Sequence, residues 1–233
     1  MNKTKLFKRK TSKYYIHKEI EIILTKIIHI KNMFSIYKKI RYTNGYEYIY
    51  KSFPKTMNIM LQSLIDRIIL ELTCLIVDYK DSDLCINGFI TKFHQYEKDY
   101  KEKKYIYIKD IDSGKKHRIY INTNDIKKDI SELENYLDRA EYIKEYLKKY
   151  RDKTISHNDK KINFKPKYKY KEMKVLVTND NLEEYIEKLF SYMNNIYSTL
   201  FKTQFIYIEE FDGELEHLNR ILEEDYKKRH KIT

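Results

Sequence analysis

Arg151 and His157 stand with five residues between them in the stretch Arg-Asp-Lys-Thr-Ile-Ser-His, close to the point where the apolar pattern of a long predicted helix runs out. An imidazole gives or takes a proton near neutral pH. A guanidinium binds a phosphate through a fixed fork of donors and stabilises the charge that builds on it. Cleavage of an RNA phosphodiester needs both groups. The candidate catalytic residues are therefore Arg151 and His157, with Asp152 able to position either one.

Simpler interpretations of the same residues stay open at this level. Eight arginines and seven histidines in 233 residues produce an Arg followed by His after four to six positions about 0.7 times by chance. Arg151 can also be a cation that is attracted by the negative end of a helix dipole. His157 can be a helix cap or an interior histidine, and Asp152 can be a solvated carboxylate. The neighbouring lysines fit the dipole interpretation too: Lys148, Lys149 and Lys153.

The elements that must hold these residues are long amphipathic helices. Only four Gly and two Pro interrupt the chain, and no repeat is present, which is typical of long helices with few tight turns. The helix expected over about 55–79 is apolar around so much of its circumference that we expect it to be central and nearly buried. Apolar residues at steps of three and four predict helices over about 14–41, 55–79, 82–100, 124–154, 178–200 and 214–228.

The candidate site lies at the end of the helix expected from 124 or 125 to about 154. At about 100° per residue, six positions place Arg151 and His157 roughly 120° apart, on opposite sides of the apolar seam of this helix. One straight helix does not bring them together easily. Either the Arg of one copy meets the His of a second copy, or the helix breaks near Ser156 and folds His157 back. The seam consists of Ile126, Ile130, Leu133, Leu137, Ala140, Ile143, Leu147, Tyr150 and Thr154.

A change of period predicts one insertion in this helical chain. Between about 104 and 122 the apolar period falls from about 3.6 to 2, in Tyr-Ile-Tyr-Ile and again in His-Arg-Ile-Tyr-Ile, which indicates a β-hairpin. A basic N-terminal arm over about 1–13 and a basic linker over about 160–174 complete the organisation. We therefore predict a single all-α domain over residues 1–233, an up-and-down helical bundle with a small β-hairpin insertion.

The charge balance favours a polyanionic partner. The chain has 47 Lys and Arg against 35 Asp and Glu, a net charge of +12, which attracts RNA, DNA or an anionic membrane. Compositional drift in an AT-rich genome is an alternative explanation, because Lys, Ile, Asn and Tyr dominate the sequence. The candidate RNA-binding residues are the lysines beside and after the site: Lys148, Lys149, Lys153, Lys160 and Lys161.

Other classes of site find little support. The chain has no Gly-rich phosphate loop, paired-Cys metal site or nucleophile elbow, so we expect no cofactor and no metal. Cys74 is expected to pack as a small hydrophobe inside its helix, and two cysteines suit a reducing, cytoplasmic location. The strongest apolar run, from Ile68 to Val77, contains Glu71 and is about half as long as a membrane span. We expect no membrane partner.

The chain resembles the HEPN superfamily, and within it the abortive-infection branch of the AbiU type. The resemblance rests on residues 150–159, Tyr-Arg-Asp-Lys-Thr-Ile-Ser-His-Asn-Asp, at the end of a long helix. It extends over about residues 55–225, with looser matches outside the motif. These lie at residues 64–72, Asp78, residues 83–86 and residues 178–183.

The resemblance implies a helical bundle that is usually dimeric and often a metal-independent ribonuclease. HEPN ribonucleases carry Arg, then four to six residues, then His, often with a polar residue directly after the Arg, and Arg151, Asp152 and His157 match these positions. It implies attack of the ribose 2′-hydroxyl on the neighbouring phosphate, with His157 transferring protons and Arg151 on the developing oxyanion. The implied role is that of a toxin or phage-defence effector. Its implied partners are RNA, a second copy of the chain, and a neutralising antitoxin or defence partner protein.

Two features depart from the family pattern. Asp159 stands where HEPN toxins that are modified by a partner nucleotidyltransferase carry Tyr, and the hairpin is not part of the minimal bundle. Some HEPN domains only bind nucleic acid or proteins. The alternative function is therefore a non-catalytic module that binds RNA or another polypeptide.

Overall fold

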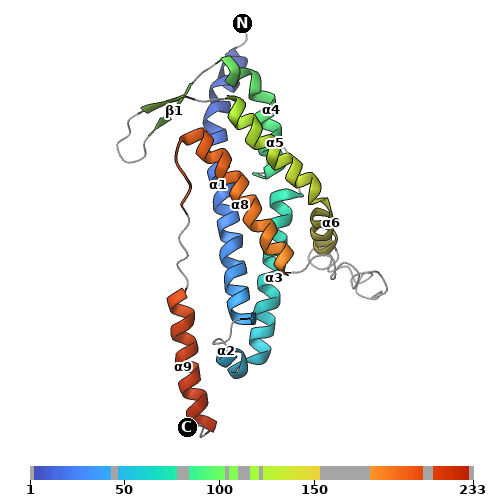
Figure 1. Ribbon diagram of the computed structural model, residues 1–233, viewed down its shortest axis with the longest axis vertical. Helices are drawn as coiled ribbons and strands as arrows, with labels where there is room; N and C mark the ends of the chain where they lie inside the picture. Colours follow the sequence, from blue (N-terminus) through green and yellow to red (C-terminus); the bar gives the residue numbers. More distant parts are fainter. Residues whose placement is uncertain are drawn as a thin grey trace.

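The protein is an elongated bundle of helices in which α1 begins at one end and α9 finishes at the other (Figure 1). The all-α architecture predicted from the sequence is confirmed in the part of the chain that the structure covers. The computed structural model describes residues 3–42, 47–77, 84–102, 105–109, 116–120, 123–152, 179–206 and 212–230.

Most helices lie where the apolar periodicity predicts them, although several ends differ. The first helix starts at Lys3 rather than at about residue 14, because no Gly or Pro interrupts it before Tyr42. Most of the predicted N-terminal arm is therefore helical. The short α2 was not predicted. The helices are α1 (Lys3–Tyr42), α2 (Glu47–Ser52), α3 (Pro54–Ile76), α4 (Ile86–Glu102), α5 (Thr123–Arg139), α6 (Glu141–Tyr150), α8 (Asn179–Phe201) and α9 (Asp212–His230).

The helix α1 is the axis of the bundle. It packs along α3 and α8 and also touches α4, while α5 lies on α8 and α6 lies on α3 (Figure 1). The buried apolar side chains of these helices form one continuous core, and each fully buried Ile or Leu stabilises the fold by about 1.5–3 kcal/mol. Central members of the core are Ile20, Ile23, Ile27, Ile68, Leu72, Leu75, Ile130, Leu133, Leu189 and Met193.

Two further contacts complete the bundle. Lys92 of α4 pairs with Glu19 of α1 at 2.7 Å, and Glu19 is buried, so this carboxylate is compensated where α4 meets α1. At the other end, α2 packs against α9. A small separate cluster of Ile40, Met57 and Leu61 contacts the partly buried Leu222 of α9 there.

Two short strands lie within the range where the sequence predicts the insertion. β1 (Tyr105–Lys109) and β2 (Lys116–Tyr120) pair antiparallel, with Tyr105 opposite Tyr120 and Lys109 opposite Lys116. The residues that connect them lie outside the described ranges. In Figure 1 β1 projects sideways from the upper end of the bundle, on the opposite side from α6.

The prediction of one unbroken helix from 124 to about 154 is wrong. Two helices meet at Ala140, whose backbone has φ −93° and ψ 18°. The N–H groups of Ile143 and Lys144 both donate to the Ala140 carbonyl, at 2.9 and 3.4 Å. The break redirects the chain, since α5 packs on α8 whereas α6 packs on α3. The predicted seam is nevertheless buried at every position from Ile126 to Tyr150, and Thr154 lies outside the described residues.

The helix α3 is less enclosed than its composition predicts. Ile59 is 70% exposed, and Cys74 is exposed rather than packed as a small hydrophobe. The reason is that the main neighbours of α3 are α1 and α6, which leave part of its circumference uncovered. None of the described helices combines the length and the hydropathy that crossing a lipid bilayer requires.

Candidate active site at the end of α6

The helix α6 is short, strongly amphipathic and held on α3 by its apolar side. Its buried residues follow steps of three and four, which places them on one face: Ile143, Tyr146, Leu147 and Tyr150. After Tyr150 the chain continues into a wider, π-type turn at Arg151 and Asp152. The Arg151 N–H is shared between the carbonyls of Leu147 and Lys148.

Tyr150, the last α-helical residue, is tied to α3 by its hydroxyl. The hydroxyl donates to Asp66 Oδ1 at 2.6 Å. Gln62 Nε2 donates to the same hydroxyl at 3.1 Å and to Asp66 Oδ1 at 2.8 Å. The three side chains thus form a closed set of hydrogen bonds, and Tyr150 is only 5% exposed. This set anchors the end of α6 one residue before Arg151.

Arg151 is paired with its own neighbour. Its Nε donates to Asp152 Oδ1 at 3.0 Å, and its Nη2 lies 3.0 Å from the same oxygen. The side chain of Arg151 is 17% exposed and that of Asp152 is 44% exposed. The carboxylate contacts two of the guanidinium nitrogens and so restricts the orientation of this group. A guanidinium held in this way can bind an anionic oxygen or stabilise one that forms during a reaction.

The lysines predicted to bind RNA divide into two groups. Lys148 is exposed and lies three residues before Arg151, so both fall on the same side of the helix. Lys149 is 3.7 Å from Glu145. These two lysines therefore share the end of α6 with Arg151 and Asp152. The other predicted residues lie outside the described ranges: Lys153, His157, Lys160 and Lys161.

The pairing of Arg151 with His157 accordingly stays a prediction, whereas Arg151 and Asp152 are in contact. Sequence reasoning missed the roles of Gln62 and Asp66. Their only signal was two polar residues four positions apart, which places them on one face of a helix. The part of the chain described by the structure contains no group of three or more His, Cys, Asp and Glu side chains arranged to hold a metal ion.

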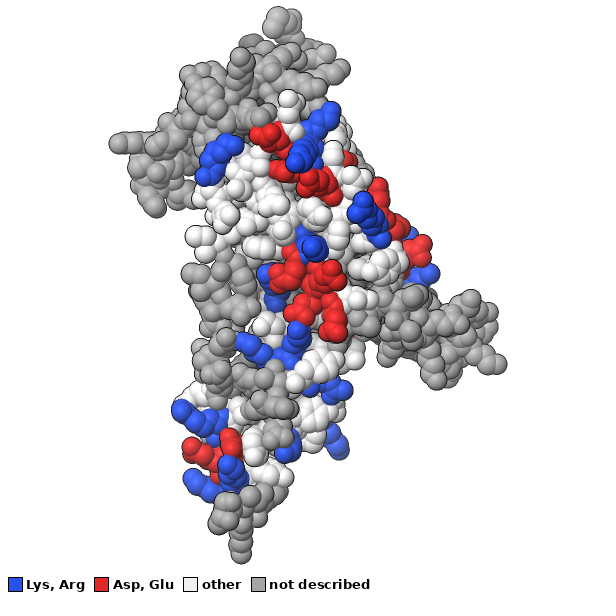
Figure 2. Space-filling model, in the orientation of Figure 1, with Lys and Arg blue, Asp and Glu red and all other residues white. Residues whose placement is uncertain are grey.

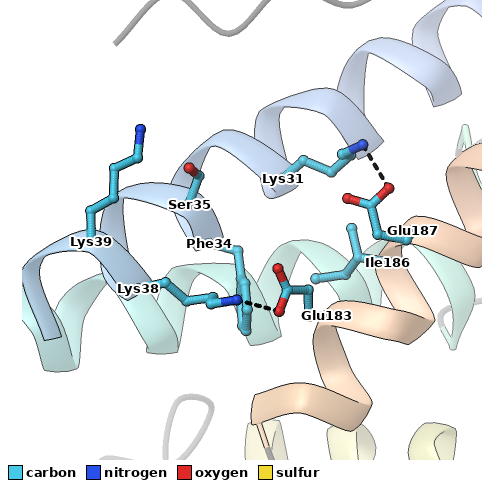
Figure 3. Close-up of a pocket in the computed structure, with 8 residues that line it drawn as sticks. All are labelled: Lys31, Phe34, Ser35, Lys38, Lys39, Glu183, Ile186 and Glu187. Atoms are coloured by element: carbon cyan, nitrogen blue, oxygen red, sulfur yellow. Dashed lines mark hydrogen bonds and ion pairs between the residues drawn. The ribbon is translucent and has the colours of Figure 1, made fainter. Parts of the chain in front are cut away.

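A second set of charged residues lines a pocket of about 230 Å³ between α1 and α8. Figure 3 shows Lys31 and Lys38 of α1 reaching toward Glu187 and Glu183 of α8, at 2.8 and 2.5 Å respectively. Figure 2 shows acidic side chains gathered where α8 crosses this face of the molecule. Because both lysines already have carboxylate partners, this pocket offers less positive charge to an anion than its residue types suggest.

Comparison with known proteins places the chain in a family. A family model described as AbiU2, of the HEPN group, matches residues 23–214. The match includes α3, α6, the motif from Arg151 to His157 and α8. No curated protein and no solved structure matches the chain. Since the family match covers well over half of its length, the protein belongs to the AbiU2 family, a HEPN family of the abortive-infection type.

Proposed function

We propose that this protein is a metal-independent endoribonuclease that cleaves RNA as an effector of abortive infection. Membership of the AbiU2 family supports the HEPN part of this proposal. The observation that supports the ribonuclease part is the position and orientation of the Arg151 side chain. This residue occupies the Arg position of the HEPN motif, is held at the end of α6, and is oriented by the polar residue that follows it, Asp152.

The reaction divides the chemistry between two side chains. The ribose 2′-hydroxyl attacks the adjacent phosphorus while His157 accepts its proton or protonates the leaving 5′-oxygen. The bond from phosphorus to the 5′-oxygen breaks, which leaves a 2′,3′-cyclic phosphate on one fragment and a 5′-hydroxyl on the other. Arg151 stabilises the negative charge that builds on the phosphoryl oxygens. Removal of one such donor typically costs about 10²–10³ in rate.

The active unit in this proposal is a homodimer with composite sites. Arg151 and His157 fall on opposite sides of the seam if the helical spacing continues, so the Arg of one copy would act with the His of the other. The RNA backbone would be held by the lysines around the two groups through contacts to phosphates. These are Lys148, Lys149, Lys153, Lys160 and Lys161.

The direct test is cleavage of a defined RNA oligonucleotide by the purified protein in excess EDTA. We expect products with cyclic phosphate ends, and no cleavage when the scissile nucleotide carries a 2′-deoxyribose. Arg151→Ala and His157→Ala should each abolish cleavage. The matched controls are Arg139→Ala and His94→Ala, which remove exposed groups of the same type elsewhere. Cleavage that survives both motif variants would overturn the assignment, and RNA binding without cleavage by the wild type would favour the non-catalytic alternative.

The composite site is tested by mixing the two inactive variants. A heterodimer of the Arg151→Ala and His157→Ala chains contains one site with both wild-type groups if each site draws on two copies. We then expect about half of the wild-type activity per heterodimer. If each site lies within one chain, every site in the mixture lacks one group and no activity returns. Analytical ultracentrifugation of the wild type checks that the dimer forms at the assay concentration.

A further inference from the structure

We propose that Asp66 and Gln62 of α3 are positioning residues that act through the Tyr150 hydroxyl to set the direction in which Arg151 leaves α6. This inference rests on the proposed function, because it assigns a supporting role at the same site. The contacts that carry it are the bonds from Tyr150 to Asp66 Oδ1 at 2.6 Å and from Gln62 to both partners.

Burial alone does not explain the polar groups in this contact. Ile143 and Leu147 join α6 to the core through hydrocarbon, and a Phe at position 150 would fill the same seam. The Tyr150 hydroxyl instead reaches an acceptor on α3 at a distance typical of a hydrogen bond to an ionised carboxylate. Gln62 bonds to both members, so the orientation of each group depends on the other two. The set fixes a direction as well as a distance.

The placement of the anchor explains why a fixed direction matters. The last turn of a helix frays easily, because its carbonyl groups lack partners within the helix. Arg151 follows the anchored residue directly and has its own carboxylate partner at Asp152. If Tyr150 were released, the turn at Arg151 and Asp152 would move together, and the guanidinium would shift relative to a bound phosphate. A displacement of about 1 Å in a reacting geometry costs about 10²-fold in rate.

The chain offers graded variants and a matched control. Tyr150→Phe removes only the hydroxyl, Asp66→Ala removes the acceptor, and Asp66→Asn keeps an acceptor oxygen without the charge. The control is another interhelical hydrogen bond of 2.6 Å, from Thr199 Oγ1 of α8 to Asp129 Oδ2 of α5. Thr199→Val and Asp129→Ala break this bond without touching α3 or α6.

The experiment measures RNA cleavage together with the Nε–Hε NMR signal of Arg151, assigned with Arg151→Lys. Tyr150→Phe should lower kcat about tenfold and Asp66→Ala about tenfold to 100-fold, with KM within twofold of wild type. Asp66→Asn should restore most of kcat. The Arg151 signal should shift or broaden in the first two variants and stay unchanged in Thr199→Val and Asp129→Ala. Melting curves identify any variant that fails to fold, and Tyr150→Phe, the most conservative change, then decides.

Two results would overturn the positioning role. One is wild-type kcat in Tyr150→Phe and Asp66→Ala, and the other is an Arg151 signal that neither variant changes. A wild-type protein that does not cleave RNA would contradict the proposed function instead. The NMR measurement would still decide in that case whether Asp66 and Gln62 orient Arg151, since it does not depend on turnover.

Discussion

The end of α6 and the pocket between α1 and α8 both pair cations with carboxylates, but the partners are joined in opposite ways. Lys31 and Lys38 find their partners 156 and 145 residues away, whereas Arg151 is paired with the next residue. The pocket pairs exist only when two helices come together. Arg151 and Asp152 are neighbours in the unfolded chain as well, so their pairing adds little to the stability of the fold. We infer that the pairs between α1 and α8 stabilise the bundle, whereas the pair of Arg151 and Asp152 orients a side chain of the candidate site.

The distribution of charge supports the same distinction. The sequence from 153 to 178, directly after Asp152, carries eight lysines and two acidic residues. The described surface over α8, in contrast, gathers acidic side chains (Figure 2). Much of the positive excess lies in the basic N-terminal arm, and about half of the net charge of +12 follows the motif directly in sequence. A polyanion such as RNA would be attracted there rather than to the pocket.

Arg151→Ala should separate activity from stability by the largest margin. We expect RNA cleavage to fall by about 100-fold or more and the melting temperature to change by less than about 2 °C, because the lost pair joins adjacent residues. Cleavage assays and calorimetry on the same preparation measure both. A melting temperature that falls by 5 °C or so would show that Arg151 holds the fold together, which would remove the distinction between the two regions.

Tyr185→Phe should do the reverse. It should change how the stability of the fold depends on pH and leave RNA cleavage unchanged. Burial, followed by the nearby Tyr136, raises the pKa of Tyr185. The folded protein therefore keeps this proton to a higher pH than the unfolded chain. The contribution of Tyr185 to stability is fully present below about pH 10, the pKa of a tyrosine in the unfolded chain, and is lost as the pH rises above that value.

At pH 11 the loss due to Tyr185 is about 1.4 kcal/mol, and the Phe variant should not show it. Urea unfolding at pH 7 and pH 11 measures the difference. Tyr42→Phe, at an exposed tyrosine of α1, is the control and should lose stability with pH like the wild type. An identical pH dependence in the wild type and Tyr185→Phe would refute the assignment of this loss to Tyr185.

Asp152→Asn should strengthen RNA binding two- to fivefold, because the carboxylate that competes with phosphate for Arg151 loses its charge. The measurement is fluorescence anisotropy with labelled RNA at fixed salt, in the His157→Ala background so that the RNA stays intact. Glu183→Gln, which removes the corresponding charge in the pocket, should leave the affinity unchanged. Weaker binding in Asp152→Asn would mean that the carboxylate orients Arg151 more than it competes for it.

The smallest effect is expected from the pocket itself. Lys38→Met should lower the free energy of unfolding by about 0.2–1 kcal/mol, or the melting temperature by about 1–4 °C, with cleavage unchanged. A double-mutant cycle with Glu183→Gln isolates the energy of the pair. Lys188→Met, at an exposed lysine of α8, controls for the loss of a surface charge. Zero coupling energy would mean that the pair between α1 and α8 does not stabilise the bundle.

Much of the fold could be predicted because helices follow the apolar period. The seam from Ile126 to Tyr150 is buried as predicted. The break at Ala140 could not be found in this way, because alanine is the best helix former and no Gly or Pro stands near it. The exposure of Ile59 was also unpredictable from its residue type, since it depends on which helices cover α3.

For the site, the sequence by itself determined the residue types and their order: Arg151, the polar Asp152 beside it, and His157 at HEPN spacing. These are local features, and the pairing of Arg151 with Asp152 follows from adjacency. Only the tertiary structure decided that Gln62 and Asp66, more than 80 residues earlier, anchor Tyr150. Such partners depend on the bend that turns α6 onto α3, and that bend results from packing between distant helices rather than from the preference of any residue for its own backbone conformation.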